Sequence, residues 1–191
     1  GSTESNNWAL KGICQDNPNI KNKIITTEME HSSINETLEY LKTKGYEVIY
    51  SPLKDGVIDI ESLEKILTKE VALITVASVN SETGTLQPVE KIAKLSKKYK
   101  IPFHCDMTQS IGKINIPLEN IDLISLSAHK IYGPKGIGLL LKNKDLPIKS
   151  IIYGERKYNL GLLKGLTKAL EISQKNLEQN YKKVEDLNNY L

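Results

Sequence analysis

A lysine that could do covalent chemistry follows a short apolar run and precedes a turn rich in glycine. Lys130 closes the segment Ser127-Ala128-His129-Lys130, and Gly133, Pro134 and Gly136 follow it closely. An amine that forms an imine must lose its proton readily, and a semi-buried position beside other cationic groups promotes that loss. A surface lysine in a loop gives the same pattern. The residues around Lys130 therefore leave the catalytic and the surface interpretation equally open.

Other polar residues stand where apolar runs give way to loops. Asp106 is suited to pair with a protonated pyridine nitrogen, and Gln109 is expected to face the same pocket. His31 can stack on a planar ring and exchange protons near neutral pH. Ser2 and Thr3 begin a predicted helix whose free N–H groups attract phosphate. Helix capping is a simpler explanation for Asp106, His31, Ser2 and Thr3, so each signal is weak alone.

Short apolar runs alternate with amphipathic segments and predict the scaffold that positions these residues. Strands are expected at Lys23–Thr27, Glu47–Tyr50, Val71–Ala77, Pro102–Cys105, Leu123–Ser127 and Ile137–Leu141. Helices are expected at Glu4–Lys11, Ser32–Lys44 (capped by Ser32 or Ser33), Ile60–Leu67 and Pro88–Tyr99. A long C-terminal helix is expected from Leu162 to Tyr190, with Leu163, Leu166, Leu170, Leu177 and Val184 facing inward. The alternation predicts an α/β fold with a mainly parallel sheet flanked by helices, which binds ligands at the carboxyl ends of its strands.

The composition narrows the class of protein. The 26 Lys and Arg residues outnumber the 23 Asp and Glu residues by only three, and the lysines are spread along the chain. This balance argues against direct binding of nucleic acid. Cys14 and Cys105 form no CxxC pair and are expected to be free thiols in a reducing compartment. The sequence has no apolar run of about 18 residues and no signal-peptide pattern, which predicts a cytoplasmic protein without a membrane partner.

Several segments together resemble the class V aminotransferase fold family, and within it the cysteine desulfurases of the NifS type. The matching segments are Ser2–Asn7, Glu30-His31, Asn80–Pro88, His104–Gln109 and Ser127–Lys130 with its Gly-rich tail. They occur in the family's order and spacing over roughly residues 1–142. The resemblance implies a large domain that binds pyridoxal phosphate (PLP) over residues 1–160. Residues 161–191 are expected to form a C-terminal helix that leads toward a small domain absent from this chain.

The resemblance also implies a role for each matching residue. Lys130 would hold PLP through a Schiff base, and His31 would stack on the cofactor ring and move protons. Asp106 would pair with the pyridine nitrogen, and Gln109 would contact the phenolic oxygen. The residues expected to bind the phosphate are Ser2, Thr3, Ser127 and His129. No metal site is expected.

The family's reaction converts L-cysteine to L-alanine and transfers the sulfur to an acceptor through a cysteine persulfide. The resemblance further implies a homodimer, a sulfur-acceptor or scaffold protein as partner, and a role in iron–sulfur cluster assembly or tRNA thiolation. Two alternatives stay open. One is another class V PLP enzyme, such as a selenocysteine lyase or an aminotransferase-like enzyme. The other is a non-catalytic module with the PLP fold that serves assembly.

The sequence departs from the family pattern in several places. Neither Cys14 nor Cys105 matches the family's nucleophile, which lies in the C-terminal small domain, and Cys105 is expected to be a small buried residue. The family segment GGQERGLRSGT, which reaches the partner subunit's cofactor phosphate, appears as residues 154–161 without its Arg-Ser-Gly-Thr portion. Ser81 replaces the second Asn of the family's Asn-Asn-Glu, and the N-terminal Asn-Ala-Thr-Thr segment is absent.

Overall fold

A six-stranded sheet forms the centre of the computed structural model, which describes residues 1–14, 21–155 and 159–190. Its strands are β1 Lys23–Thr26, β2 Glu47–Tyr50, β5 Val71–Ala77, β6 Phe103–Asp106, β7 Leu123–Ser127 and β8 Gly138–Lys142. They lie in the order β2-β1-β5-β6-β7-β8. All neighbours from β2 to β7 pair in parallel, and only β8 runs antiparallel to its neighbour β7. The prediction of a mainly parallel sheet is confirmed.

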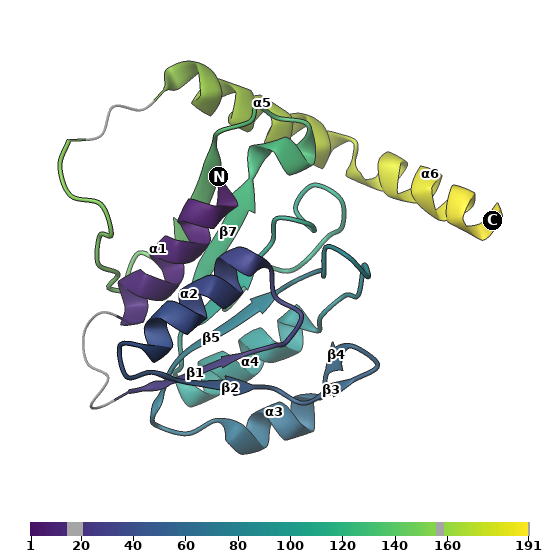
Figure 1. Ribbon diagram of the computed structural model, residues 1–191. Coiled ribbons are helices and arrows are strands. Elements are labelled where there is room, and N and C mark those ends of the chain that lie inside the picture. Colours follow the sequence, from purple (N-terminus) through teal and green to yellow (C-terminus); the bar gives the residue numbers. More distant parts are fainter. Residues whose placement is uncertain (15–20, 156–158, 191) are drawn as a thin grey trace.

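Helices cover both faces of this sheet (Figure 1). α1 Ser2–Cys14 and α2 Ser32–Lys42 pack on one face, and α3 Ile60–Ile66 and α4 Val89–Tyr99 pack on the other. A short hairpin, formed by β3 Leu53–Lys54 and β4 Val57–Ile58, was not anticipated from the pattern. Its turn holds Asp55 and Gly56, both with positive φ, at 51° and 77°. Two-residue strands are too short to leave a periodic signal in the sequence.

The core is divided in two because neighbouring residues of a strand point to opposite faces. Ile24 and Leu73 lie in the apolar cluster beneath α1 and α2. Ile25 and Ile74, each one position further along the chain, lie in the cluster beneath α3 and α4. Every residue of β5 is buried, as expected for a central strand covered on both faces. The strand β5 therefore joins the two halves of the core.

Shortening one side chain of β5 tests this account of the core. Ile74 is fully buried, and we expect Ile74→Val to lower the free energy of unfolding by about 0.5–1.5 kcal/mol, since it removes one packed methyl group. Val184→Ala, at a residue that is 65% exposed, is the control and should change it by less than about 0.5 kcal/mol. Urea denaturation of both variants measures the difference. Equal effects would contradict the assignment of β5 to the core.

The C-terminal part forms two helices, so the expectation of one long helix is wrong. α5 Leu160–Lys175 ends at Asn176, whose N–H bonds to the carbonyls of Ile172 and Gln174, and α6 Leu177–Tyr190 begins directly after it. Asparagine favours such breaks because its side chain competes for backbone hydrogen bonds. α5 buries Leu166 and Ala169 against the turn that follows β7.

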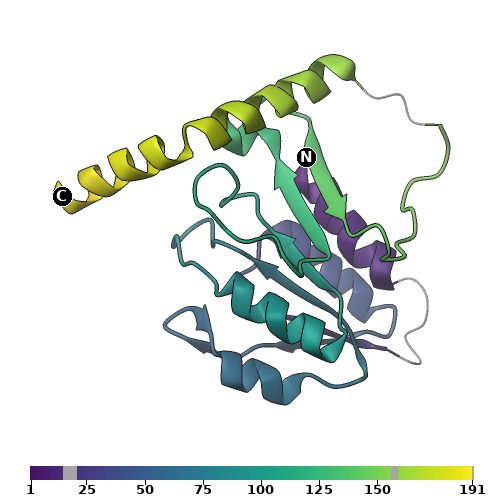
Figure 2. The same cartoon turned by 180° about the vertical axis from the view of Figure 1, so that it is seen from behind.

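The second of these helices projects away from the rest of the chain (Figure 2). α6 has no buried residue. Val184 is 65% exposed and Leu163, on α5, is 41% exposed, so the expectation that both face inward is also wrong. Among the described residues, no helix has the length and apolar character needed to cross a membrane. Arg156, in the shortened segment noted above, lies outside the described residues.

Candidate functional site

A cavity of about 260 Å³ lies where the parallel strands of the sheet end. Its walls come from the start of α1 and from the segments after β1, β5, β6 and β7. Seven of the residues singled out in the sequence line it: Ser2, Thr3, His31, Asp106, Gln109, His129 and Lys130. Its other lining residues are Met29, Ala77, Val79, Asn80, Ser81 and Thr108. Residues more than 100 positions apart in the sequence therefore meet in one small polar space.

Ser127 is the one candidate that does not line this cavity. It is fully buried, and its Oγ lies 2.8 Å from Nδ1 of His129. The contact orients the imidazole of His129, which does line the cavity. Ser127 thus acts on the cavity through His129.

Asp106 is held from two sides at the end of β6. The sequence placed it just after the strand, whereas it is the last residue of β6 and is buried. Its Oδ2 accepts a hydrogen bond of 2.8 Å from Nδ2 of Asn6 in α1, and its Oδ1 accepts one of 2.9 Å from the N–H of Thr108. These two donors fix the plane of the carboxylate. Asn6 was part of a recognised motif but was not expected at the site.

His31 caps α2, where Ser32 or Ser33 was expected to do so. Its Nδ1 accepts the N–H of Ser33 at 3.1 Å and also lies 2.9 Å from the Ser33 Oγ. Helix N-caps are usually Ser, Thr, Asp or Asn, which is why the sequence pattern pointed to the serines. These contacts to Nδ1 hold the imidazole of His31 at the cavity and leave its other nitrogen, Nε2, out of the cap.

Lys130 lies in a single turn of 3₁₀ helix, η1 Ala128–Ile131, directly after β7. It is exposed, whereas a semi-buried position was expected. A second lysine lies close by: burial, followed by the charge of Lys130, lowers the pKa of Lys113. Lys113 donates a hydrogen bond of 3.1 Å to Oε1 of Gln109. Because an ammonium group only donates, the amide nitrogen of Gln109 must point away from Lys113.

The N-terminus of α1 opens into the cavity at Ser2 and Thr3. The first intrahelical hydrogen bonds run from the N–H groups of Glu4 and Ser5 to the carbonyl of Gly1, which leaves the preceding N–H groups free of helical acceptors. Gly138 permits this placement. A Cβ at position 138 would lie 2.6 Å from the carbonyl carbon of Gly1. Only glycine lets β8 approach the start of α1 so closely.

Two buried titratable groups lie behind the cavity. Glu30 accepts hydrogen bonds from the hydroxyl of Thr27 at 2.7 Å and from the N–H of Ala77 at 2.8 Å, and burial raises the pKa of Glu30 to about 8. His104 is fully buried between the hydroxyls of Thr75 and Ser125, and burial lowers the pKa of His104 to about 4. Neither group lines the cavity.

These pKa values predict how stability changes with pH. Glu30 has an ordinary pKa of 4.5 when unfolded, so between pH 4.5 and about 8 the native state holds a proton that the unfolded state has lost. The contribution of Glu30 to the free energy of unfolding therefore has its full value below pH 4.5 and decreases as the pH rises toward 8. His104 acts in the opposite sense, but only between about pH 4 and its ordinary pKa of 6.5. Between pH 6.5 and 8, the change in stability therefore comes mainly from Glu30 and not from His104.

We expect the free energy of unfolding to fall by up to about 2 kcal/mol between pH 6.5 and 8. Glu30→Gln, which cannot ionise, should remove most of this slope. Urea denaturation at several pH values in this range measures both proteins. The same slope in both would show that Glu30 is ionised in the native state.

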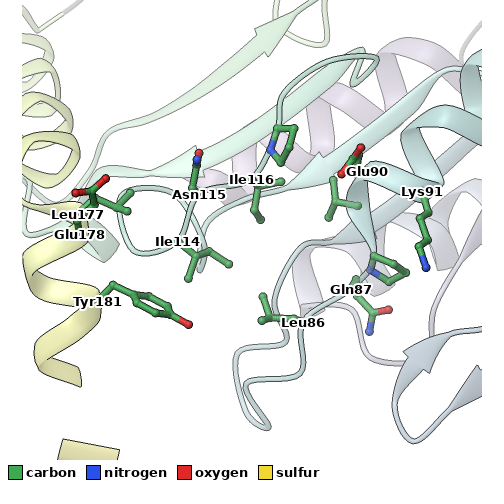
Figure 3. A pocket seen from close by; sticks show the side chains of 13 residues that line it. Leu86, Gln87, Glu90, Lys91, Ile114, Asn115, Ile116, Leu177, Glu178 and Tyr181 are labelled. Atoms are coloured by element: carbon green, nitrogen blue, oxygen red, sulfur yellow. The ribbon is translucent and has the colours of Figure 1, made fainter. Parts of the chain in front are cut away.

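Two larger cavities lie beside α6, and Lys130 is the one described residue of the polar cluster that also borders one of them. One, of about 630 Å³, is bordered by Leu86, Ile114 and Tyr181 (Figure 3), and the other, of about 650 Å³, lies between α6 and the turn of Lys130. Both have mainly apolar walls. Chemistry requires converging polar groups, so the 260 Å³ cavity is the candidate site despite its smaller size.

Both cysteines of the chain are buried and unpaired. Burial raises the pKa of the Cys14 thiol to about 12 and raises the pKa of the Cys105 thiol well above its usual range. Thiols in such positions stay protonated and are poor nucleophiles. In the described part of the chain, His, Cys, Asp and Glu residues form no group that could hold a metal ion.

Comparison with known proteins shows the family to which the chain belongs. Residues 1–156 match the family model described as aminotransferase class V. The chain is 38% identical over 198 residues to the cysteine desulfurase IscS of Clostridium botulinum, and 36% identical over 200 residues to the mitochondrial cysteine desulfurase of Arabidopsis thaliana. These alignments cover 98% of this chain but 50% and 44% of the relatives. The chain thus spans about half the length of these relatives.

A solved structure described as a NifS-like protein superposes with a TM-score of 0.95 at 37% identity. The match covers 99% of this chain and 55% of the other. By sequence match and by fold, the chain belongs to the aminotransferase class V family.

Proposed function

We propose that this chain is the cofactor-binding part of a PLP-dependent cysteine desulfurase, which converts L-cysteine to L-alanine and passes the sulfur to an acceptor. One observation carries the proposal. The amine of Lys130, the carboxylate of Asp106, the imidazole of His31 and the start of α1 all border the same cavity. The relatives named above are described as cysteine desulfurases, which favours this activity over the other class V reactions.

The residues present fit PLP in number and in chemistry. The cavity of about 260 Å³ is slightly smaller than the usual range for sites of drug-sized ligands, roughly 300–1,000 Å³, and so suits a small planar molecule. The N-terminus of a helix of 13 residues offers free N–H groups to a phosphate. The buried Oγ1 of Thr108, at the cavity wall, has no hydrogen-bond partner among the described residues. Such an orphaned hydroxyl is a ready partner for a bound ligand.

Each of the candidate residues has a distinct task in this proposal. Lys130 attaches the cofactor through its Nζ and exchanges protons with the substrate. Asp106 binds the protonated pyridine nitrogen, and Gln109 donates its amide hydrogen to the phenolic oxygen. His31 stacks on the ring and moves protons. The phosphate is bound by Ser2, Thr3 and His129, with Ser127 orienting His129. When bound, PLP would supply an electron sink for the electrons left at the substrate's α-carbon when its proton is removed, which prepares the Cβ–S bond for attack by the acceptor thiol.

The thiol that receives the sulfur is proposed to come from outside residues 1–191. Cys14 and Cys105 are both buried, and their raised pKa values keep them protonated. We further propose that residues 1–160 form the PLP domain, with 161–191 leading toward a small domain. A homodimer, a sulfur-acceptor or scaffold partner, a role in iron–sulfur cluster assembly and a cytoplasmic location complete the proposal.

Addition of PLP to the purified chain tests the central claim. We expect a yellow protein with a visible absorbance band that saturates at one PLP per chain. Treatment with borohydride should fix the cofactor to the protein, and peptide mapping should place it in the peptide containing Lys130. A protein that stays colourless at millimolar PLP would refute the cofactor assignment. If cysteine left a persulfide on this chain, the proposal that the sulfur-accepting thiol lies outside residues 1–191 would be refuted.

A further inference from the structure

We propose that Asn6 and Ser33 form a hydrogen-bonded bridge between Asp106 and His31, and that this bridge holds His31 as the tautomer with its proton on Nε2. Asn6 and Ser33 are positioning residues, since neither is assigned a contact with cofactor or substrate. The catalytic meaning of the bridge rests on the proposed function. Its existence and its effect on the tautomer do not.

The orientation of the Asn6 amide follows from its surroundings. Asn6 is fully buried, and its Nδ2 lies 2.8 Å from Oδ2 of Asp106 and 2.9 Å from Oγ of Ser33. Its Oδ1 is buried without a hydrogen-bond partner in the described part of the chain. The flipped amide would place Oδ1 against the carboxylate, where two acceptors repel each other. The amide nitrogen therefore gives one hydrogen to Asp106 and the other to Ser33.

The hydrogen of the Ser33 hydroxyl then has one clear destination. Its oxygen already receives a hydrogen from Asn6, and it lies 2.9 Å from Nδ1 of His31. The backbone N–H of Ser33 donates to the same Nδ1 at 3.1 Å. A ring nitrogen that accepts hydrogen bonds carries a lone pair, so in the neutral imidazole the proton is on Nε2.

The bridge thus determines what His31 presents to the cavity. In the structure as described, Nε2 makes no hydrogen bond, and it is the nitrogen left to meet a ligand. Within the proposed function, His31 exchanges protons with the substrate through this nitrogen. The bridge determines which ring nitrogen of His31 carries the proton before any substrate binds. It also links α1, α2 and β6, the three elements that carry Asn6, Ser33 and Asp106.

Nuclear magnetic resonance of the cofactor-free chain tests this inference directly. With ¹⁵N-labelled histidine, couplings between ring nitrogens and carbon-bound protons distinguish the two neutral tautomers. The chain has only three histidines, and a His31→Gln variant identifies the signals of His31. At a pH where the ring is neutral, we expect a pyridine-type Nδ1 and a protonated Nε2. A protonated Nδ1 in the unmodified protein would overturn the inference.

Variants of the bridge make the test quantitative. Ser33→Ala removes the hydroxyl donor but keeps the backbone N–H, and should lower the ratio of the Nε2–H to the Nδ1–H tautomer about fivefold. Ser33→Thr keeps a hydroxyl and should preserve the ratio. Ser32→Ala makes the same chemical change at the adjacent, exposed residue and is the matched control. An unchanged ratio in Ser33→Ala would show that the hydroxyl does not hold Nδ1.

A second variant tests the link through Asn6. Asn6→Asp keeps the shape of the side chain, and the new carboxyl group should share a proton with the adjacent carboxyl group of Asp106. No hydrogen is then left for Ser33, so the Ser33 hydroxyl should turn toward the oxygen of the new side chain that faces it. We expect the tautomer ratio to fall in the same direction as in Ser33→Ala. None of these measurements needs PLP, so failure of cofactor binding refutes the proposed function and leaves the bridge supported. A normal holoprotein whose His31 carries its proton on Nδ1 refutes the bridge alone.

Discussion

Replacing Lys130 with alanine is expected to abolish the covalent attachment of PLP. Lys130 is the lysine that lines the polar cavity, directly after β7. Alanine has no amine, so the cofactor can bind only through its phosphate and ring contacts. After borohydride treatment and unfolding, we expect the amount of cofactor retained by the variant to fall to background. Fluorescence of the reduced cofactor on the denatured chain measures this loss.

The neighbouring lysines supply the controls for this experiment. Lys135 is exposed in the same loop and does not line the cavity, so Lys135→Ala should keep the linkage. Burial, followed by the charge of the nearby Lys130, lowers the pKa of Lys113, so among the described lysines Lys113 is the alternative anchor suggested by position. If the Lys130→Ala variant retained the reduced cofactor and the Lys113→Ala variant lost it, the anchor would be Lys113.

Asp106→Asn should weaken the binding of PLP severely. The change keeps the shape of the side chain but removes the negative charge that faces the pyridine nitrogen in the proposed complex. Loss of one partner of a buried, hydrogen-bonded charge pair costs about 2–5 kcal/mol, so we expect the Kd for PLP to rise roughly 30-fold or more. Titration of each apoprotein with PLP, monitored by the visible absorbance, gives the Kd of the variant and the Kd of the unmodified protein.

Asp122→Asn is the matched control for Asp106→Asn. Asp122 precedes β7, and its carboxylate accepts the N–H of Phe103 at the start of β6, at the opposite end of the strand from Asp106. The same chemical change there should leave the Kd unchanged within about twofold. Equal affinities for the Asp106→Asn and unmodified proteins would show that the carboxylate does not bind the cofactor. Urea denaturation checks that each variant is folded.

The scaffold was largely predictable because each element leaves a local pattern. The run Val71–Ala77 is apolar throughout, and only a strand covered on both faces has that pattern in a parallel sheet. The amphipathic spacing of Ser32–Lys44 gave a helix that ends two residues earlier, at Lys42. The break at Asn176 was missed, since apolar residues continue at helical spacing on both sides of it. Val184 was placed inward for the same reason and is exposed.

The sequence by itself determined which chemical groups the site contains. Lys130, Asp106, Gln109 and His31 each follow a strand or end one, and parallel strands bring such residues to one edge of the sheet. That argument needs only the local pattern and the family's motifs. It does not need the order of the strands.

Only the tertiary structure decided how these groups are connected. The bond between Asn6 and Asp106 joins residues 100 positions apart, and it exists because α1 packs over the end of β6. Ser127 was expected in the cavity wall but lies behind His129, and His31 rather than a serine caps α2. Such contacts depend on how side chains pack between elements. No periodicity within one element records that packing, so the sequence could name the chemical groups but not the hydrogen bonds that orient them.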